Sequence, residues 1–134
     1  MPKMMGKSVA LSATLALALL ASAPLYADAV IRHFALSSSM PAADATVEEA
    51  HAIHLTFTQV PKEEGRLIRL ADPQGKQIEL GEIHMDGEMV LAAHIAADHL
   101  TNGTYTVSWR SAGDDGHFVT GDYTFTLQAI NPHR

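Results

Sequence analysis

Asp115 and His117 are the two residues of this sequence whose types and spacing best suit metal chemistry. A carboxylate and an imidazole are ligands for Cu(II), Zn(II) and Ni(II). Gly116 lies between them and permits a tight turn on which both side chains can converge. A site needs a third ligand, and His33 is the candidate because the first strand of a β-sandwich can lie near a late loop. The alternative is that all three are ordinary polar surface residues.

Two runs of alternating apolar residues flank this motif, Tyr105 to Trp109 and Tyr123 to Leu127. A period of two places the apolar side chains on one face, as in half-buried strands. The connection between the runs is rich in Gly and Asp, which is typical of a turn. The sequence therefore predicts that Asp115 and His117 lie on a turn held by two strands.

Further strands are predicted before this hairpin. The stretch His51 to Thr58 alternates and places His54 on its solvated face, and Arg66 to Ala71 precedes a turn at Asp72 to Gly75. About seven short strands at a spacing of roughly 8–12 residues predict an all-β, immunoglobulin-like Greek-key sandwich. The other strands are expected at Lys76 to Leu80 and Met89 to Ile95, and the expected core residues are Phe57, Tyr105, Val107, Trp109, Phe125 and Leu127.

The secondary structure between the apolar stretch Val30 to Leu36 and the first alternating strand has two interpretations. The Ser and Pro residues of Ser37 to Pro41 are expected to stop a strand and turn the chain. A short helix over Ala42 to Ala52 is an alternative, since Asp44 could cap it, although its apolar spacing is poor.

Residues 1–29 have the pattern of a secretory signal peptide. Lys3 and Lys7 form a basic start, Val9 to Leu20 is apolar, and Ala27-Asp28-Ala29 resembles a cleavage site. The apolar run is short for a membrane anchor, and nothing later in the chain is apolar enough to span a bilayer. The expected organisation is a signal peptide at 1–29 and one β-sandwich domain at 30–134.

Charge and composition narrow the classes of partner. The formal net charge is −6, and removal of residues 1–29 leaves seven Lys and Arg against fourteen Asp and Glu, or −7. An acidic domain is a poor match for nucleic acid or anionic lipid but is compatible with cations. The chain has no cysteine and eight histidines, so a metal site must use imidazole, carboxylate, thioether or backbone groups. His84 with Met85 and Met89 is an alternative thioether site for Cu(I), although core packing explains methionines more simply.

The sequence resembles the CopC family of periplasmic copper-resistance proteins, which includes the YobA-type proteins. The stretch His33 to Ala42 is similar to the opening of the family, in which a His precedes a Ser-rich run and Pro-Ala. Leu100 to Arg110 follows the pattern L-x-x-G-x-Y-x-V-x-W-R, and Asp115 to Phe125 follows D-G-H-x-x-x-G-x-x-x-F. The resemblance covers essentially all of Val30 to Leu127.

The resemblance implies a β-sandwich that carries or buffers Cu(II) in the periplasm without catalysis. In the family, Cu(II) is bound by the amine and imidazole of an N-terminal His and by the Asp and His of the D-G-H loop. His33, Asp115 and His117 take those roles here, and Zn(II) could use the same ligands. A CopD-like inner-membrane copper transporter is the implied partner.

Three departures from the family pattern bear on this expectation. Ala35 stands where a second His is often found, and Val30-Ile31-Arg32 precede His33. The loop at Asp72 to Gln77 contains no Met, so no Met-rich Cu(I) site is expected. A CopC-like structural or interaction module that has lost its metal is therefore a second hypothesis. A third is a copper-dependent enzyme that cleaves polysaccharides oxidatively, although the sequence offers no aromatic platform for such a substrate.

Overall fold

The computed structural model describes residues 33–130, and the predicted signal peptide lies outside this range. Within it the chain forms nine β-strands and no helix. The strands are β1 (Leu36–Met40), β2 (Thr46–Val47), β3 (Ala52–Phe57), β4 (Leu67–Ala71), β5 (Gln77–Ile78), β6 (His84–Met85), β7 (Val90–His94), β8 (Gly103–Ala112) and β9 (Phe118–Leu127).

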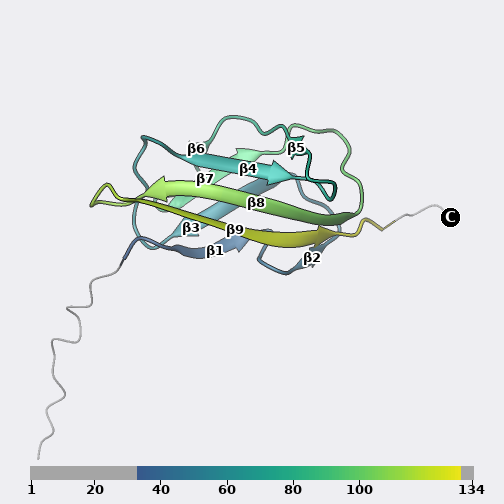
Figure 1. Cartoon of the computed structure of the whole chain (residues 1–134), viewed down its shortest axis with the longest axis horizontal. Helices are drawn as coiled ribbons and strands as arrows, with labels where there is room; N and C mark the ends of the chain where they lie inside the picture. The colour runs from purple at the N-terminus through teal and green to yellow at the C-terminus, as the bar shows by residue number, and fades with distance from the viewer. Residues whose placement is uncertain (1–32, 131–134) are drawn as a thin grey trace, which may run out of the picture. The chain divides into compact units, whose positions relative to one another are not determined.

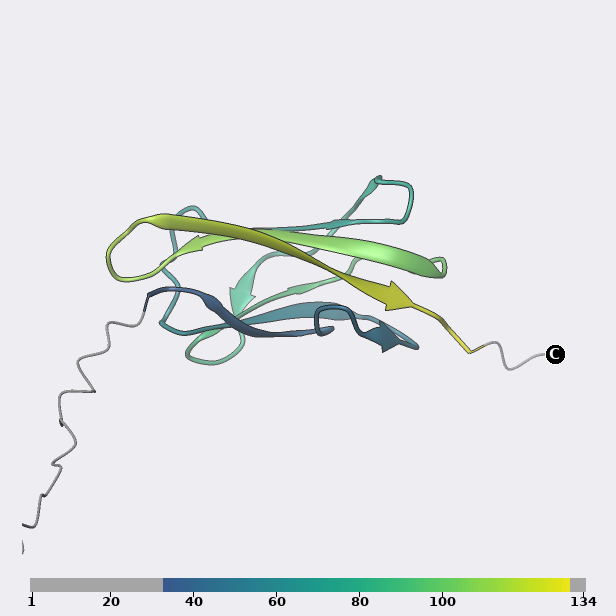
Figure 2. The same cartoon turned by 60° about the horizontal axis from the view of Figure 1, so that its bottom comes forward.

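The strands form two sheets that lie one over the other (Figures 1 and 2). One sheet has the order β1-β3-β7-β6, and the other has the order β2-β9-β8-β4-β5. The chain crosses between the sheets several times, and every pairing is antiparallel except that of β2 with β9. The predicted immunoglobulin-like Greek-key sandwich is confirmed, and three of its strands have only two residues.

The apolar residues of the alternating runs meet between the sheets. All six predicted core residues are buried. Phe57 contacts Trp109 edge to face at 5.2 Å between ring centroids, and Tyr105 stacks on Phe125 at 5.6 Å. Burial of one such side chain stabilises the fold by about 1.5–3 kcal/mol, so the alternating pattern determines which face of each strand points inward.

The hairpin of β8 and β9 is longer than the sequence predicts. Its register runs from Gly103 opposite Leu127 to Ala112 opposite Phe118, which leaves only residues 113–117 as a loop. Gly121 lies opposite Trp109, and a Cβ at Gly121 would come within 2.6 Å of the indole Cζ2. The glycine therefore lets the indole lie across β9, and pairing continues through residues whose polar character had suggested a loop.

Two predictions for the segment before β3 need correction. The strand does end within Ser37 to Pro41, but it ends at Met40, because Ser37 to Ser39 belong to β1 and pair with β3. The alternative helix over Ala42 to Ala52 does not form. Its backbone groups bond to β9 instead: Asp44 N donates to the Thr124 carbonyl at 2.7 Å, and Ala45 accepts from the Thr126 N at 2.8 Å.

The turn at Asp72 to Gly75 is confirmed. Gly75 N donates to the Asp72 carbonyl at 2.8 Å, and Asp72 Oδ1 accepts from the backbone N of Gln74 and Lys76 at 2.9 and 2.8 Å. Gly75 has a φ of 84°, a left-handed conformation that glycine adopts without a Cβ clash. This turn joins β4 to the short β5 at the edge of its sheet.

Candidate metal site

The loop between β8 and β9 brings the Asp115 and His117 side chains together. Nδ1 of His117 lies 3.2 Å from Oδ2 of Asp115, and both side chains are mostly exposed. The other carboxylate oxygen, Oδ1, accepts a hydrogen bond from the His117 backbone N at 3.0 Å. One carboxylate oxygen thus fixes the turn, and the other faces the imidazole.

The same contacts keep the carboxylate charged. Hydrogen bonds from the backbone N and then the side chain of His117 lower the pKa of Asp115 below its ordinary value. Each of these bonds favours the anionic form, because a carboxylate accepts hydrogen bonds better than a carboxylic acid does. Asp115 is therefore anionic across the neutral range, which is the state in which a carboxylate binds a metal.

The loop itself has defined anchors. Gly116 has a φ of 77°, and its N donates to the Gly113 carbonyl at 3.0 Å. Asp114 N donates to the side-chain Oε1 of Gln59 at 3.1 Å, which ties the loop to the segment after β3. Gln59 was not predicted from the sequence, because a contact across 55 positions leaves no local signal in spacing.

The chain around His33 lies beside this loop. Phe34 is buried and stacks on Phe57 with ring centroids 4.8 Å apart. A Cβ at Gly113 would come within 2.7 Å of Phe34 Cδ1, so the two segments are in close contact. The Thr58 hydroxyl donates to the His33 carbonyl at 2.8 Å and accepts from Ala35 N at 3.0 Å.

The structure does not complete the three-ligand set. Across residues 33–130, no three His, Cys, Asp or Glu side chains converge closely enough to hold a metal ion. His33 is exposed, and its backbone is fixed next to the loop while its imidazole does not join Asp115 and His117. The structure thus brings Asp115 and His117 together, and His33 is not part of that pair.

The alternative thioether site does not form. His84 and Met85 are successive residues of β6 and point to opposite faces, and Met85 packs against the core. Met89 is 38% exposed in the connection before β7. His54 lies on the solvated face of β3, as predicted, with 38% of its side chain exposed.

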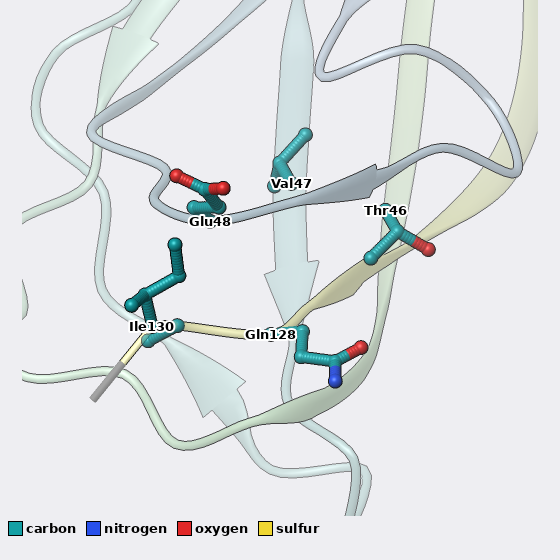
Figure 3. A pocket seen from close by; sticks show the side chains of 6 residues that line it. Thr46, Val47, Glu48, Gln128 and Ile130 are labelled. Atoms are coloured by element: carbon teal, nitrogen blue, oxygen red, sulfur yellow. The ribbon is translucent and has the colours of Figure 1, made fainter. Parts of the chain in front are cut away.

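A surface hollow where β2 runs alongside β9 offers no better site. Figure 3 shows Val47, Glu48, Gln128 and Ile130 around it. Of its lining side chains only Glu48 is of a metal-binding type. The β8–β9 loop is therefore the better candidate.

Comparison with known proteins supports the fold and the motif. A family model described as the CopC domain matches residues 36–128, which is most of the described chain. The chain belongs to the CopC family. The match contains both motifs of the β8–β9 hairpin, and His33 lies three residues before its start.

Two proteins of Escherichia coli are similar to this chain along most of their length. Protein YobA of strain K12 is 32% identical over 125 residues, covering 90% of this chain and 98% of YobA. Copper resistance protein C is 29% identical over 116 residues, covering 76% of this chain and 86% of that protein.

Solved CopC-family structures have the same fold. PcoC, described as a methionine-rich copper resistance protein from Escherichia coli, aligns with a TM-score of 0.64 and 26% identity, covering 72% of this chain and all of PcoC. CopC from Methylosinus trichosporium OB3b also aligns with a TM-score of 0.64, at 24% identity, and covers 76% of this chain. Between residues 33 and 130 there is no helix long and apolar enough to cross a membrane.

Proposed function

We propose that this CopC-family protein is exported to the periplasm and carries or buffers Cu(II), with His33, Asp115 and His117 as ligands and no catalytic step. Two similar proteins have names that refer to copper resistance. A CopD-like inner-membrane copper transporter is the proposed recipient of the ion. Zn(II) is a competing ion for the same ligands.

The observation that carries this proposal is the 3.2 Å separation of His117 Nδ1 and Asp115 Oδ2. Two donor atoms that each lie about 2.0–2.1 Å from one ion are about 2.9–3.4 Å apart at angles between 90° and tetrahedral. The pair thus has the spacing of two ligands on one ion, and a metal would replace the proton that Nδ1 shares with the carboxylate.

His33 supplies the third ligand in this proposal. The His33 carbonyl is bonded to Thr58, and the neighbouring Phe34 lies against Gly113. To bind an ion held by Asp115 and His117, the His33 side chain and the residues before it would have to change conformation. Export with cleavage directly before His33 would add an amine ligand on the same residue. Cleavage after Ala29 would leave His33 as an imidazole ligand only, with weaker Cu(II) binding.

Titration of the purified protein with Cu(II), followed by EPR, tests the site. We expect one tight equivalent with nitrogen coordination in the wild type and loss of that signal in His117→Ala. The matched control is His51→Ala, because His51 Nε2 also lies 3.2 Å from a carboxylate, that of Glu49, on an exposed segment. An unchanged signal in His117→Ala would show that the loop is not the site.

Ala35 and the residues before His33 favour a second candidate function, a CopC-like module without a metal. Sequencing the N-terminus of the exported protein separates the two when it is combined with the titration. A tight equivalent in a protein that begins at His33 supports the carrier. A protein that begins at Val30 and binds no Cu(II) tightly supports the module.

A further inference from the structure

A second group of metal-binding side chains lies on the other sheet. The face of β3, β7 and β6 that points away from the core carries His54, His84, Asp86 and His94, which we call the outer-face histidine patch. Ala92 is at its centre, since His54 of β3 and His84 of β6 are both paired with it from opposite sides. Ala92 is only 1% exposed, which shows that the surrounding side chains close over it.

Two imidazoles of the patch are already near each other. The rings of His84 and His94 are stacked, with centroids 5.8 Å apart and planes inclined by 26°. An imidazole bound through nitrogen at about 2.0–2.1 Å has its centroid about 3.2 Å from the ion, so two imidazoles on one tetrahedral ion have centroids about 5 Å apart. The observed separation is within about 1 Å of that value, a difference that side-chain rotation can supply.

The hydrogen bonding of His84 prepares it for a metal. Its Nδ1 lies 3.2 Å from the Glu82 carbonyl, and a carbonyl oxygen can only accept. The proton of the neutral ring is therefore on Nδ1, and Nε2 keeps its lone pair. Backbone carbonyls bind metal-ligating histidines in this way, which fixes the tautomer and orients the ring.

The backbone under both histidines is fixed by strand pairing. His84 is opposite Ala92 in the pairing of β6 with β7, and its neighbour Met85 packs inward. The His94 carbonyl accepts from Gly81 N at 2.8 Å. Ligands on paired strands need only side-chain rotation to meet an ion, whereas ligands on a mobile loop must first be ordered.

The patch also contains a carboxylate. Asp86 follows His84 by two residues, and its Oδ2 lies 3.1 Å from Nε2 of His54 across the patch. Its negative charge favours a cation nearby, and the patch contains no Lys or Arg. Because no three ligand groups converge among the described residues, an ion here would take two imidazoles and complete its coordination with water.

We propose that His84 and His94 form a second binding site for a divalent transition-metal ion such as Cu(II), open to solvent and separate from the β8–β9 loop. His94 is opposite Ala52 at the start of β3, whereas the loop is tied to Gln59 beyond the end of that strand. The six residues of β3 from Ala52 to Phe57 span roughly 16 Å, so the two sites cannot share one ion. This second site does not depend on the proposed role of the loop.

The test follows backbone amide NMR signals of the purified protein during titration with Cu(II), which broadens signals near the bound ion. In the wild type we expect broadening around residues 82–86 and 92–96 as a second equivalent is added. In the double variant His84→Gln/His94→Gln we expect this broadening to disappear and the number of bound ions to fall by one. The control, His51→Gln/His99→Gln, removes two other exposed histidines and should change neither result.

The outcomes are distinguishable. Equal broadening of β6 and β7 in wild type and double variant, or none in the wild type, overturns the second site. Absence of broadening around Asp115 to His117 counts against the proposed function instead. It does not affect the broadening expected for the amide signals of β6 and β7. Amide signals away from the substituted residues should coincide in all three proteins, because all four substituted histidines are exposed.

Discussion

Phe34 lies directly against Gly113, with its Cδ1 at 2.7 Å from the position that a Cβ on Gly113 would occupy. This contact joins the start of the domain to the loop that carries Asp115 and His117. The two residues are 79 positions apart in the sequence, so only the fold brings them together. It is the relationship that holds the segment of Phe34 against the β8–β9 loop.

Gly113→Ala should separate these two segments. The added methyl would meet Phe34 and the Gln59 side chain, both of which are held by other contacts. Such overpacking lowers the free energy of unfolding by about 1–3 kcal/mol. Urea denaturation measures the loss, and the affinity for Cu(II) should fall with it, because His33 and the loop move apart.

Gly81→Ala is the matched control for that substitution. A Cβ at Gly81 would lie 3.8 Å from its nearest neighbours, which is ordinary van der Waals contact, and neither glycine has a positive φ. Both variants gain the same restriction of the unfolded chain. Equal stability of the two variants would show that the Phe34–Gly113 contact does not constrain the fold.

Asp115→Asn should weaken Cu(II) binding while leaving the loop folded. The amide oxygen of Asn can still accept from the His117 backbone N, as Oδ1 of Asp115 does at 3.0 Å, but the negative charge is lost. We expect the affinity for Cu(II), measured by competition titration, to fall at least about tenfold. Removal of the carboxylate that hydrogen-bonds to a metal-ligating histidine lowers metal affinity by a similar factor. Asp114→Asn, one residue earlier and also exposed, is the control. Equal affinities for Asp115→Asn and the wild type would exclude Asp115 as a ligand.

Tyr123 should make the fold sensitive to alkaline pH. Burial raises the pKa of the Tyr123 hydroxyl, and the Ser39 side chain offsets this only in part. Because the folded pKa lies above the unfolded value of about 10, the stabilisation is fully present below pH 10 and is lost as the pH rises through the folded pKa. Unfolding free energies measured between pH 8 and 11 should fall less steeply in Tyr123→Phe than in the wild type. If the unfolding free energies of the two proteins fell in parallel with pH, Tyr123 would not be the source of the alkaline sensitivity.

Tyr105→Phe should destabilise the protein at neutral pH. The Tyr105 hydroxyl donates to the Thr101 carbonyl at 2.7 Å, and its ring is fully buried. Loss of this hydrogen bond should lower the free energy of unfolding by about 1 kcal/mol. The comparison variant is Tyr123→Phe, because the Tyr123 hydroxyl has no hydrogen-bond partner in good geometry within residues 33–130. A larger loss in Tyr123→Phe than in Tyr105→Phe would contradict this account.

Local chemistry explains which features were predictable. Alternation of apolar residues identified β3, β4, β8 and β9, because a half-buried strand needs a period of two. The turn at Asp72 to Gly75 was predictable because the residues that stabilise it are part of it. The Asp72 side chain accepts a hydrogen bond from a backbone N of the turn, and Gly75 adopts its left-handed conformation. The short strands β2 and β6 had no such signal, since two residues cannot show a period.

The sequence by itself identified Asp115 and His117 as two residues of metal-binding type on either side of Gly116. The motif around them indicated the family. Tertiary structure decided what lies beside that pair. Phe34 on Gly113 and Gln59 on Asp114 bring the segment before β1 and the segment after β3 to the loop. The tertiary structure also places His54, His84 and His94 on one face of a sheet. Strand register decides which distant residues become neighbours, and the local spacing of residues does not contain that information.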